Sequence, residues 1–502
     1  MKIIGINFLS DSSISFIKNG NLEFALSEER INRVKNWGGN PLKSISQCLN
    51  VHKIETNNVD HFCTHGVSSY DLNKANQSED YLNAIKEIKS SNHSNRIKNF
   101  LINKIRFRKK IENKAYKRNK LLIEKLKKKL NSNIEIYDHH LCHAASAACF
   151  SGWKKCLVLT IDGYGDAASS KLYKFEKNSF KELKKTSILH SLGYFYGSIT
   201  KYLGFKPHRH EGKVLGLAAY GNPKKAYKIM SDLISYDKKI KNFKGGFRNG
   251  FLPLFDNQYL KKILKPYKKI DIAAAAQKRL EDVVISYIKD VNQKKFKIAL
   301  AGGVFANVKL NQKISELKKV EDIFVFPNMG DGGLSTGAAA LSYIKHTRRC
   351  PKKINNVYLG RKFNNKEIEK KIKLFKLNYK TPSNIEKIVA EKLHQGQIIS
   401  IFNGKLEFGP RSLGNRSILS RATNPEINKS LNKKLKRTEF MPFAPVTLSR
   451  FKNKMYLNCR KGKLTSKFMT ITYKCKKKME ELSPAAVHID STARPQIVDQ
   501  GI

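Results

Sequence analysis

Two strand–turn–strand segments, each with an acidic turn, constrain the fold of this sequence most strongly. The apolar, β-branched run Ile3 to Phe8 passes through polar residues around Asp11 into a second apolar run, Ile14 to Ile17. The run Cys156 to Ile161 repeats the pattern and ends at Asp162-Gly163, after which the chain returns as a further strand. Two copies of one hairpin predict a duplicated α/β fold with a nucleotide cleft between its halves.

The turn at Asp162 has two interpretations. An Asp at the carboxyl end of a strand, followed by Gly, stands where α/β folds place ligand and metal contacts. A type I turn with a capping Asp would have the same sequence. Both interpretations stay open on this segment alone.

A short Ala-rich segment carries three histidines. Asp138 is a natural N-cap for a helix that runs to Ala147. On that helix His139 and His143 stand four residues apart and project from one face, as two ligands of a metal ion would. His140 points elsewhere and is expected to pack or bond locally. Histidines buried in a core, without a metal, are the alternative.

Two further strands lead into glycine-rich turns. After Phe296 to Leu300 come Gly302 and Gly303, where backbone amides can approach a phosphate or ribose closely. After Ile323 to Phe326 comes Asp331, which would complete an N,N,O metal site with the two histidines. Before these two strands, Asn249-Gly250 predicts a turn in a peripheral segment.

A second group of candidate residues is basic. Arg411 follows Gly-Pro and Arg416 follows Gly-Asn, contexts suited to bidentate binding of a phosphate or carboxylate. Lys436-Arg437 and Arg494 are candidates for the same pocket. In so basic a chain, a single Lys or Arg is more often solvated surface.

The charge is extreme, with 96 Lys and Arg against 41 Asp and Glu, a net charge of +55. A nucleic-acid surface would explain it, but the excess is mostly Lys spread along the whole chain, which favours a compositional bias. We therefore expect no nucleic-acid partner. One denser cluster, Arg96 to Lys129, predicts a Lys-coated helical insertion near 80–130, with polyanion binding as the minority interpretation.

Length and composition set the broad class. A chain of 502 residues with 40% apolar residues predicts a globular protein of two or three domains. Its apolar runs are too short to span a bilayer, and the N-terminus turns polar too early for a signal peptide. We expect a cytoplasmic protein without a membrane partner. Its cysteines lack metal or redox spacing and are expected to be reduced thiols: Cys48, Cys63, Cys142, Cys149, Cys156, Cys350, Cys459 and Cys475.

Taken together, these segments resemble the NodU/CmcH-type O-carbamoyltransferase family. The similarity runs in family order over nearly the whole chain, which makes it highly specific. Its stretches are Asp138 to Ala147, Leu159 to Asp166, Glu211 to Gly221, Ala301 to Asn307, Asn328 to Gly333, Glu407 to Leu419 and Met441 to Pro445.

The resemblance implies an actin-like ATPase, or duplicated ribonuclease-H-like, domain over residues 1–347. It implies a smaller YrdC-like α/β domain over residues 354–502. In the family, the second domain joins carbamoyl phosphate and ATP into carbamoyl-adenylate. The first domain then transfers the carbamoyl group to a hydroxyl of a sugar or secondary metabolite, beside an iron ion.

Site residues follow from the same resemblance. ATP and Fe(II), or another divalent metal, are the expected cofactors. The catalytic assignments are Asp11, which lies in the first hairpin, and two of the metal ligands, His139 and Asp162. Lys35 is added from its charged stretch, which could direct it at an anionic ligand or could be an ordinary surface helix. The metal ligands would be His139, His143, Asp162 and Asp331; the nucleotide and carbamoyl phosphate contacts would be Gly302, Gly303, Asn307, Arg411, Arg416, Lys436 and Arg494.

The sequence departs from the family at two places. Ser10 stands where the family has a histidine before Asp11, so the acid–base role of that histidine is lost or moved. The chain also stops at Ile502, before a segment that completes the family's second domain. We therefore expect an incomplete second domain, and we expect partners to include carbamoyl phosphate, a hydroxylated acceptor, a second copy in a homodimer, or a separate chain with the missing segment.

Three other functions remain open at this point. A tRNA threonylcarbamoyl transferase would use the basic charge, although the fused second domain argues against it. A truncated nucleotide-binding pseudoenzyme would fit the early stop. A sugar kinase fits least, because no feature selects γ-phosphate transfer.

Overall fold

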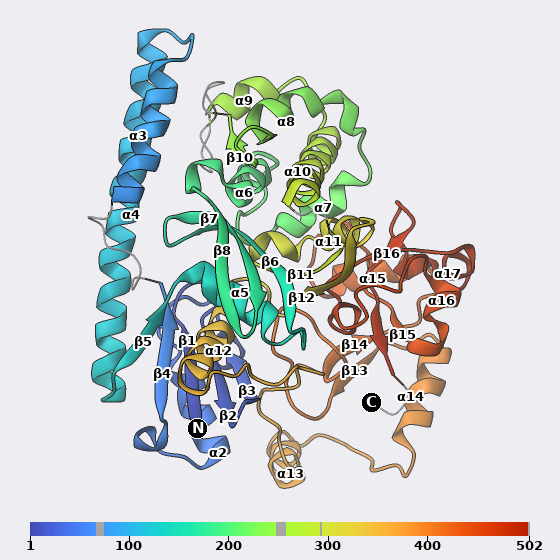
Figure 1. Ribbon diagram of the computed structural model, residues 1–502. Helices are drawn as coiled ribbons and strands as arrows, with labels where there is room; N and C mark the ends of the chain where they lie inside the picture. Colours follow the sequence, from blue (N-terminus) through green and yellow to red (C-terminus); the bar gives the residue numbers. More distant parts are fainter. Residues whose placement is uncertain (67–74, 247–250, 252–257, 292–293, 500–502) are drawn as a thin grey trace.

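The N-terminal sheet has five strands in the order β3-β2-β1-β4-β5 (Figure 1). β1, β2 and β3 come from the first hairpin and its extension, and they pair antiparallel in sequence order. β4 then pairs in parallel with β1, and β5 pairs in parallel with β4. The strands are β1 (Lys2–Asn7), β2 (Ser13–Lys18), β3 (Asn21–Ser27), β4 (His61–His65) and β5 (Ile134–Tyr137). The computed structural model describes residues 1–66, 75–246, 251, 258–291 and 294–499, so the turn predicted at Asn249-Gly250 lies outside the described residues.

The second sheet repeats this topology. Its order is β8-β7-β6-β11-β12, again with three antiparallel neighbours followed by two parallel additions. The shared order and directions agree with the duplication predicted from the two hairpins. The strands are β6 (Lys155–Gly165), β7 (Ala168–Glu176), β8 (Ser179–Thr186), β11 (Phe296–Ala301) and β12 (Val320–Val325).

Two helices of small residues lie between the sheets. α12 (Leu334–Thr347) contacts the first sheet and α5 (His139–Ala148), and α5 contacts the second sheet. The helices approach so closely that a Cβ on Gly337 would lie 1.8 Å from the carbonyl oxygen of Cys142. Ala and Gly at this crossing therefore allow the two halves to share one buried layer.

Outer helices cover the remaining faces. The first sheet is covered by α2 (Leu42–His52), and the second by α6 (Leu192–Tyr202), α10 (Lys269–Val291) and α11 (Val308–Ser315). The other elements of the first part are α1 (Glu29–Asn32), α7 (Glu211–Ala218), α8 (Tyr227–Leu233), β9 (Ile234–Asp237), β10 (Asn242–Gly245) and α9 (Gln258–Leu264).

A helical hairpin is inserted between β4 and β5. It consists of α3 (Ala75–Lys89) and the 36-residue α4 (Asn95–Leu130), which carries the Lys-rich segment. Figure 1 shows the hairpin along one side of the molecule, with its far end beyond the sheets. The last turns of α4 pack against the first sheet through Ile123, Leu126 and Leu130.

The C-terminal part forms small two-stranded sheets and short helices. Tyr456, Ile471 and Tyr473 join the core beneath the second sheet, so this part shares a core with the first. By contrast, the two helices that follow residue 364 have no buried residue. The elements are α13 (Asn365–Leu374), α14 (Ile385–His394), β13 (Ile399–Phe402), β14 (Arg416–Leu419), α15 (Glu426–Lys434), β15 (Val446–Leu448), α16 (Lys452–Met455), β16 (Tyr473–Lys474), α17 (Lys477–Leu482), β17 (Thr492–Ala493) and β18 (Gln496–Val498).

Candidate functional site

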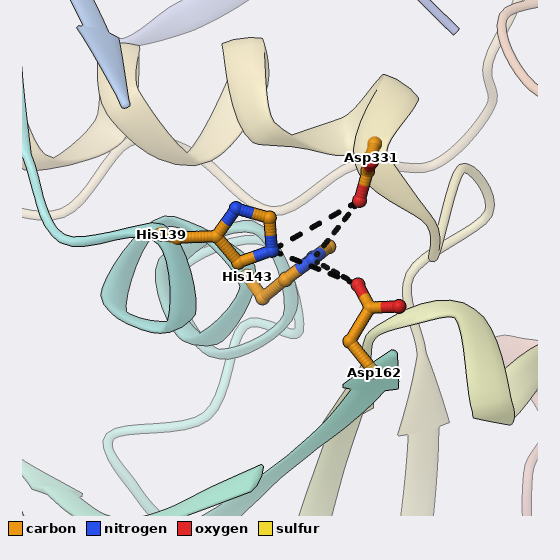
Figure 2. A group of neighbouring side chains, drawn as sticks. All are labelled: His139, His143, Asp162 and Asp331. Carbon is orange, nitrogen blue, oxygen red and sulfur yellow. Dashed lines mark hydrogen bonds and ion pairs between the residues drawn. The ribbon is translucent and has the colours of Figure 1, made fainter. Parts of the chain in front are cut away.

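The histidine helix begins as its sequence predicts. Asp138 caps α5 by accepting a hydrogen bond from the Leu141 amide at 2.8 Å, and the His139 amide donates to Asp166. His139 and His143 are both buried, and their rings point towards Asp162 and Asp331 (Figure 2). His140 points away and bonds Thr160 and the Ala168 carbonyl.

Four side chains converge at the N-terminal end of α5 (Figure 2). Nε2 of His143 lies 3.0 Å from Oδ2 of Asp162 and 3.7 Å from Oδ1 of Asp331. Nε2 of His139 lies 3.6 Å and 3.9 Å from the same two atoms. One ligand atom of each residue lies within 4.8 Å of the other three, so the four residues can surround one cation.

The pKa shifts in this group arise because its carboxylates lie close to its imidazoles. Burial opposes a charged imidazole, but the hydrogen bond to Asp162 and the charges of Asp331 and Asp162 raise the pKa of His139 to about 9. The pKa of Asp162 falls well below its usual range because the two imidazoles outweigh its burial. Nε2 of His139 is buried and lies beyond ordinary hydrogen-bond distance of both carboxylates, at 3.6 Å and 3.9 Å. A cation at the centre would satisfy both the carboxylates and this nitrogen.

Strand ends place the two carboxylates. Asp162 stands near the end of β6, and Asp331 opens the turn that leads into α12. Gly302 follows the neighbouring strand β11 with φ 102°, and a Cβ there would lie 2.3 Å from the carbonyl oxygen of Ile161. The predicted glycine turn therefore runs beside Asp162, because only glycine allows that approach.

Asn307 is used structurally. Its side chain caps α11 by accepting from the Leu310 amide at 3.0 Å, and it exchanges two hydrogen bonds with buried Gln277. Its predicted contact with a nucleotide would have to replace one of these bonds.

Asp11 and Lys35 lie on the side of the first hairpin. Asp11 accepts a hydrogen bond from Asn36 at 2.7 Å; burial and the nearby charge of Asp331 raise its pKa. Lys35 is exposed, and its charge acts on His210. Asp11 thus borders the four-residue group, whereas Lys35 faces the residues that precede α7.

Two predicted arginines form a cationic cluster with a third. Burial and the charge of Arg437 lower the pKa of Arg411 to about 10, and burial with the charges of Arg411 and Arg437 lowers the pKa of Arg494 well below its usual range. Nε of Arg411 and of Arg494 is buried without a partner in the described chain. Glu439 offsets only part of this charge, so the cluster suits an anion.

The structure separates Arg416 and Lys436 from this cluster. Arg416 donates to the carbonyl groups of Asn415 and Gly404, and stacks on Phe402 at 3.6 Å. Its guanidinium therefore fixes the β13–β14 hairpin. Lys436 is exposed, and its neighbour Arg437 is the residue beside Arg411 and Arg494. Neither residue joins the cluster in the described structure, so their contact with the nucleotide or carbamoyl phosphate stays a prediction.

Two close contacts bring the cationic cluster to the first part of the chain. A Cβ on Gly409 would lie 3.3 Å from the carbonyl oxygen of Pro327, just before Asp331. A Cβ on Gly216 of α7 would lie 3.0 Å from Met441. Arg494 lines a small hollow with Met441, Phe443 and His488.

Sequence reasoning missed His65 and Asn7. His65 ends β4, and its ring meets that of His139 edge-on at 5.5 Å between centroids. Nε2 of His65 lies 2.7 Å from Oδ1 of Asn7, and burial with the two other histidines lowers its pKa well below the usual value. A polar residue at the end of a central parallel strand was the available signal.

A second His–Glu–His group lies at the other end of α12. The rings of His61 and His346 stack at 3.7 Å, and His346 lies 2.8 Å from Glu135. Lys345 also donates to Glu135, at 2.7 Å. Because Lys345 already neutralises the Glu135 carboxylate, we interpret this group as an ion-pair cluster.

Two family models match the chain. The model of the carbamoyltransferase N-terminus matches residues 2–340, and the model of the carbamoyltransferase C-terminus matches residues 390–502. The second match shows that the family's C-terminal domain is represented, so the comparisons do not support the predicted truncation.

Relatives cover the chain almost fully. An uncharacterised protein of Methanocaldococcus jannaschii is 32% identical over 100% of this chain and 89% of its own length. Nodulation protein NolNO of Sinorhizobium fredii is 29% identical over 99% of this chain and 70% of its own length. The first alignment extends over 561 positions, so the relative has residues inside the matched region that this chain of 502 lacks.

One solved structure is also similar. HypF of T. kodakarensis matches 69% of this chain and 48% of that chain with a TM-score of 0.35 and 13% identity, a likeness too slight to define a fold.

Proposed function

Because this chain belongs to the carbamoyltransferase family, we propose that it is an ATP-dependent O-carbamoyltransferase. In the proposed reaction, carbamoyl phosphate, ATP and water form carbamoyl-adenylate with release of phosphate and pyrophosphate. The carbamoyl group then passes to a hydroxyl of a sugar or secondary metabolite, which releases AMP and the hydroxyl proton. The observation that carries the proposal is the convergence of His139, His143, Asp162 and Asp331 beside the Gly302-Gly303 turn.

The four-residue group fits a divalent metal. Two imidazole nitrogens and two carboxylate oxygens form the mixed N,O donor set that Fe(II) and similar ions accept. Nε2 of His139, which is buried and lies 3.6 Å and 3.9 Å from the two carboxylates, supports this use. When bound there, the metal would supply a Lewis acid that polarises the carbamoyl carbonyl.

The arginine cluster fits the anions of the reaction. Arg411 and Arg494, whose Nε atoms have no partner in the described chain, would bind the phosphates of carbamoyl phosphate and ATP together with Arg437. Gly302 and Gly303 would let the adenylate lie close to the backbone beside Asp162. Activation as a mixed anhydride is needed because an alcohol attacks carbamoyl phosphate poorly.

Asp11 is the residue we assign to proton transfer from the acceptor hydroxyl. The family histidine is replaced by Ser10, and Asp11 is the neighbouring acid that borders Asp331. Its burial raises its pKa, which favours acceptance of a proton.

The fold names remain part of the proposal. The duplicated strand order supports an actin-like ATPase domain over residues 1–347. The C-terminal family match supports a YrdC-like domain over residues 354–502. The cytoplasm is the proposed location.

The decisive experiment is ATP–pyrophosphate exchange. We expect exchange and AMP release that depend on carbamoyl phosphate, and loss of both in Arg494→Ala. Arg460→Ala, which removes an exposed arginine of the same part, is the matched control and should behave as wild type. Absence of exchange in the intact protein would support a nucleotide-binding protein without turnover.

A further inference from the structure

The helix α4 has an exposed face that the proposed reaction does not use. Leu101, Ile102 and Ile105 face α3, and Ile123 and Leu126 face the first sheet. The opposite side of the helix faces solvent along its whole length. Figure 1 shows the α3–α4 hairpin at the edge of the molecule, where a large flat partner can reach it.

Large apolar side chains lie along this exposed face. Phe100, Phe107 and Leu121 are 55%, 60% and 56% exposed, and stand seven or fourteen residues apart. A spacing of seven residues keeps side chains on one side of an α-helix. Ile97 and Ile111 are also exposed and lie one turn from these residues. The face is therefore an apolar stripe without a partner in the described chain.

Positive charge surrounds the stripe. Of the 36 residues of α4, fifteen are Lys or Arg and two are Glu. Over the whole chain, 96 of 502 residues are Lys or Arg, so the helix has about twice the average density. The compositional bias of the chain therefore does not account for this helix.

We propose that this face of α4 binds the surface of an anionic lipid bilayer. Basic amphipathic helices with Phe, Ile and Leu lie in the membrane interface, where the apolar side enters the headgroup boundary and the cations meet anionic lipids. None of the described helices is long and apolar enough to cross a bilayer, so the contact is peripheral. This revises the expectation that the chain has no membrane partner.

Other occupants fit the face less well. A second copy would place two strongly cationic faces against each other, which opposes association. A nucleic-acid duplex matches the cations but offers no apolar surface for Phe100, Phe107 and Leu121. An anionic bilayer satisfies both the charge and the stripe.

The same helix contacts the candidate site. Arg108, next to Phe107, donates to the hydroxyl of Tyr194 at 2.8 Å and faces the ring of Tyr164 at 5.9 Å. Tyr164 lies two residues after Asp162, in the last part of β6. Docking through α4 would thus hold the candidate site next to the bilayer, although the inference does not depend on the proposed reaction.

Sedimentation of the full chain with vesicles tests this surface. We expect binding to vesicles of phosphatidylcholine mixed with phosphatidylglycerol, and none to phosphatidylcholine alone. The double variant Phe100→Ser with Phe107→Ser should lower the partition coefficient about tenfold or more. The matched control is Leu374→Ser with Phe375→Ser at the C-terminal end of basic α13, where exposures are 63% and 65%, and it should bind as wild type.

Fluorescence separates lipid from nucleic acid. In a Phe107→Trp variant, emission should shift to the blue with mixed vesicles and stay unshifted with an RNA duplex. Circular dichroism checks that each variant is folded. The proposal is overturned if vesicles do not bind, if the double Phe variant binds as wild type, or if only the RNA duplex binds.

Discussion

Gly303 lies directly beside the carboxylate of Asp162. A Cβ added to Gly303 would stand 3.1 Å from Oδ1 of Asp162, closer than an ordinary contact. The turn proposed to admit the adenylate therefore also fixes one proposed metal ligand. Nucleotide and metal functions meet at this pair.

The first prediction concerns Gly303→Ala. The added methyl group should displace the Asp162 carboxylate by a few tenths of an ångström and weaken metal binding about tenfold or more, as changes that misplace ligands do. Titration with Fe(II) or Mn(II) would measure this. Gly330→Ala, next to Asp331 but with nothing within 4 Å of the new Cβ, is the control. Equal affinities in both variants would contradict the assignment.

A second prediction separates transfer from activation. His143→Ala should remove bound metal and lower carbamoyl transfer more than about 100-fold. Exchange of pyrophosphate should persist, because the arginine cluster is distinct from the metal group. His140→Gln, which alters a neighbouring imidazole bonded to Thr160, should keep its metal. Loss of metal in His140→Gln alone would refute the ligand set.

The third prediction concerns acid stability through Glu135. Burial opposes its charge, but hydrogen bonds from Lys345, Tyr137 and His346 lower its pKa from 4.5 to about 2. Its stabilising effect is therefore present above pH 4.5 and is lost as pH falls through 2.

Glu135→Gln should accordingly be less stable than wild type at neutral pH, and the difference should shrink as pH falls towards 2. Urea denaturation at a series of pH values measures this. A difference that stays constant over the range would show that packing, rather than charge, is responsible.

A fourth prediction tests the crossing of α5 and α12. In Gly337→Ala the new Cβ would overlap the Cys142 carbonyl, so the helices must separate. We expect a loss of about 1–3 kcal/mol in unfolding free energy. Gly212→Ala, in α7 with nothing near its Cβ, should be neutral or slightly stabilising. Thermal unfolding compares the two.

Spacing and position predicted much of the site. His139 and His143 share a face because four residues make about one helical turn. Asp162 and Asp331 come together because β6 and β12 are parallel strands of one sheet, whose carboxyl ends lie at the same edge on either side of β11. The duplicated sheets followed from two hairpins whose apolar runs have the same pattern.

Other features depend on tertiary direction, which a local pattern does not contain. Arg416 stood in a promising glycine context but turns to Phe402 and backbone carbonyls. The sequence predicts Lys436 for the arginine cluster, but its neighbour Arg437 is the residue that reaches it, since neighbouring residues point to different sides. His65 was not predicted because a single histidine at the end of a strand has no second ligand at a characteristic spacing.

The arrangement of α12 between the sheets has a mechanical consequence. Asp331 precedes α12, which packs on the first sheet, whereas Asp162 belongs to the second sheet. α5 contacts both α12 and the second sheet. A rotation of one half against the other would pull the two carboxylates apart. An ion bound by all four side chains would therefore oppose this rotation. It would stay fully coordinated only while the two halves hold the carboxylates together.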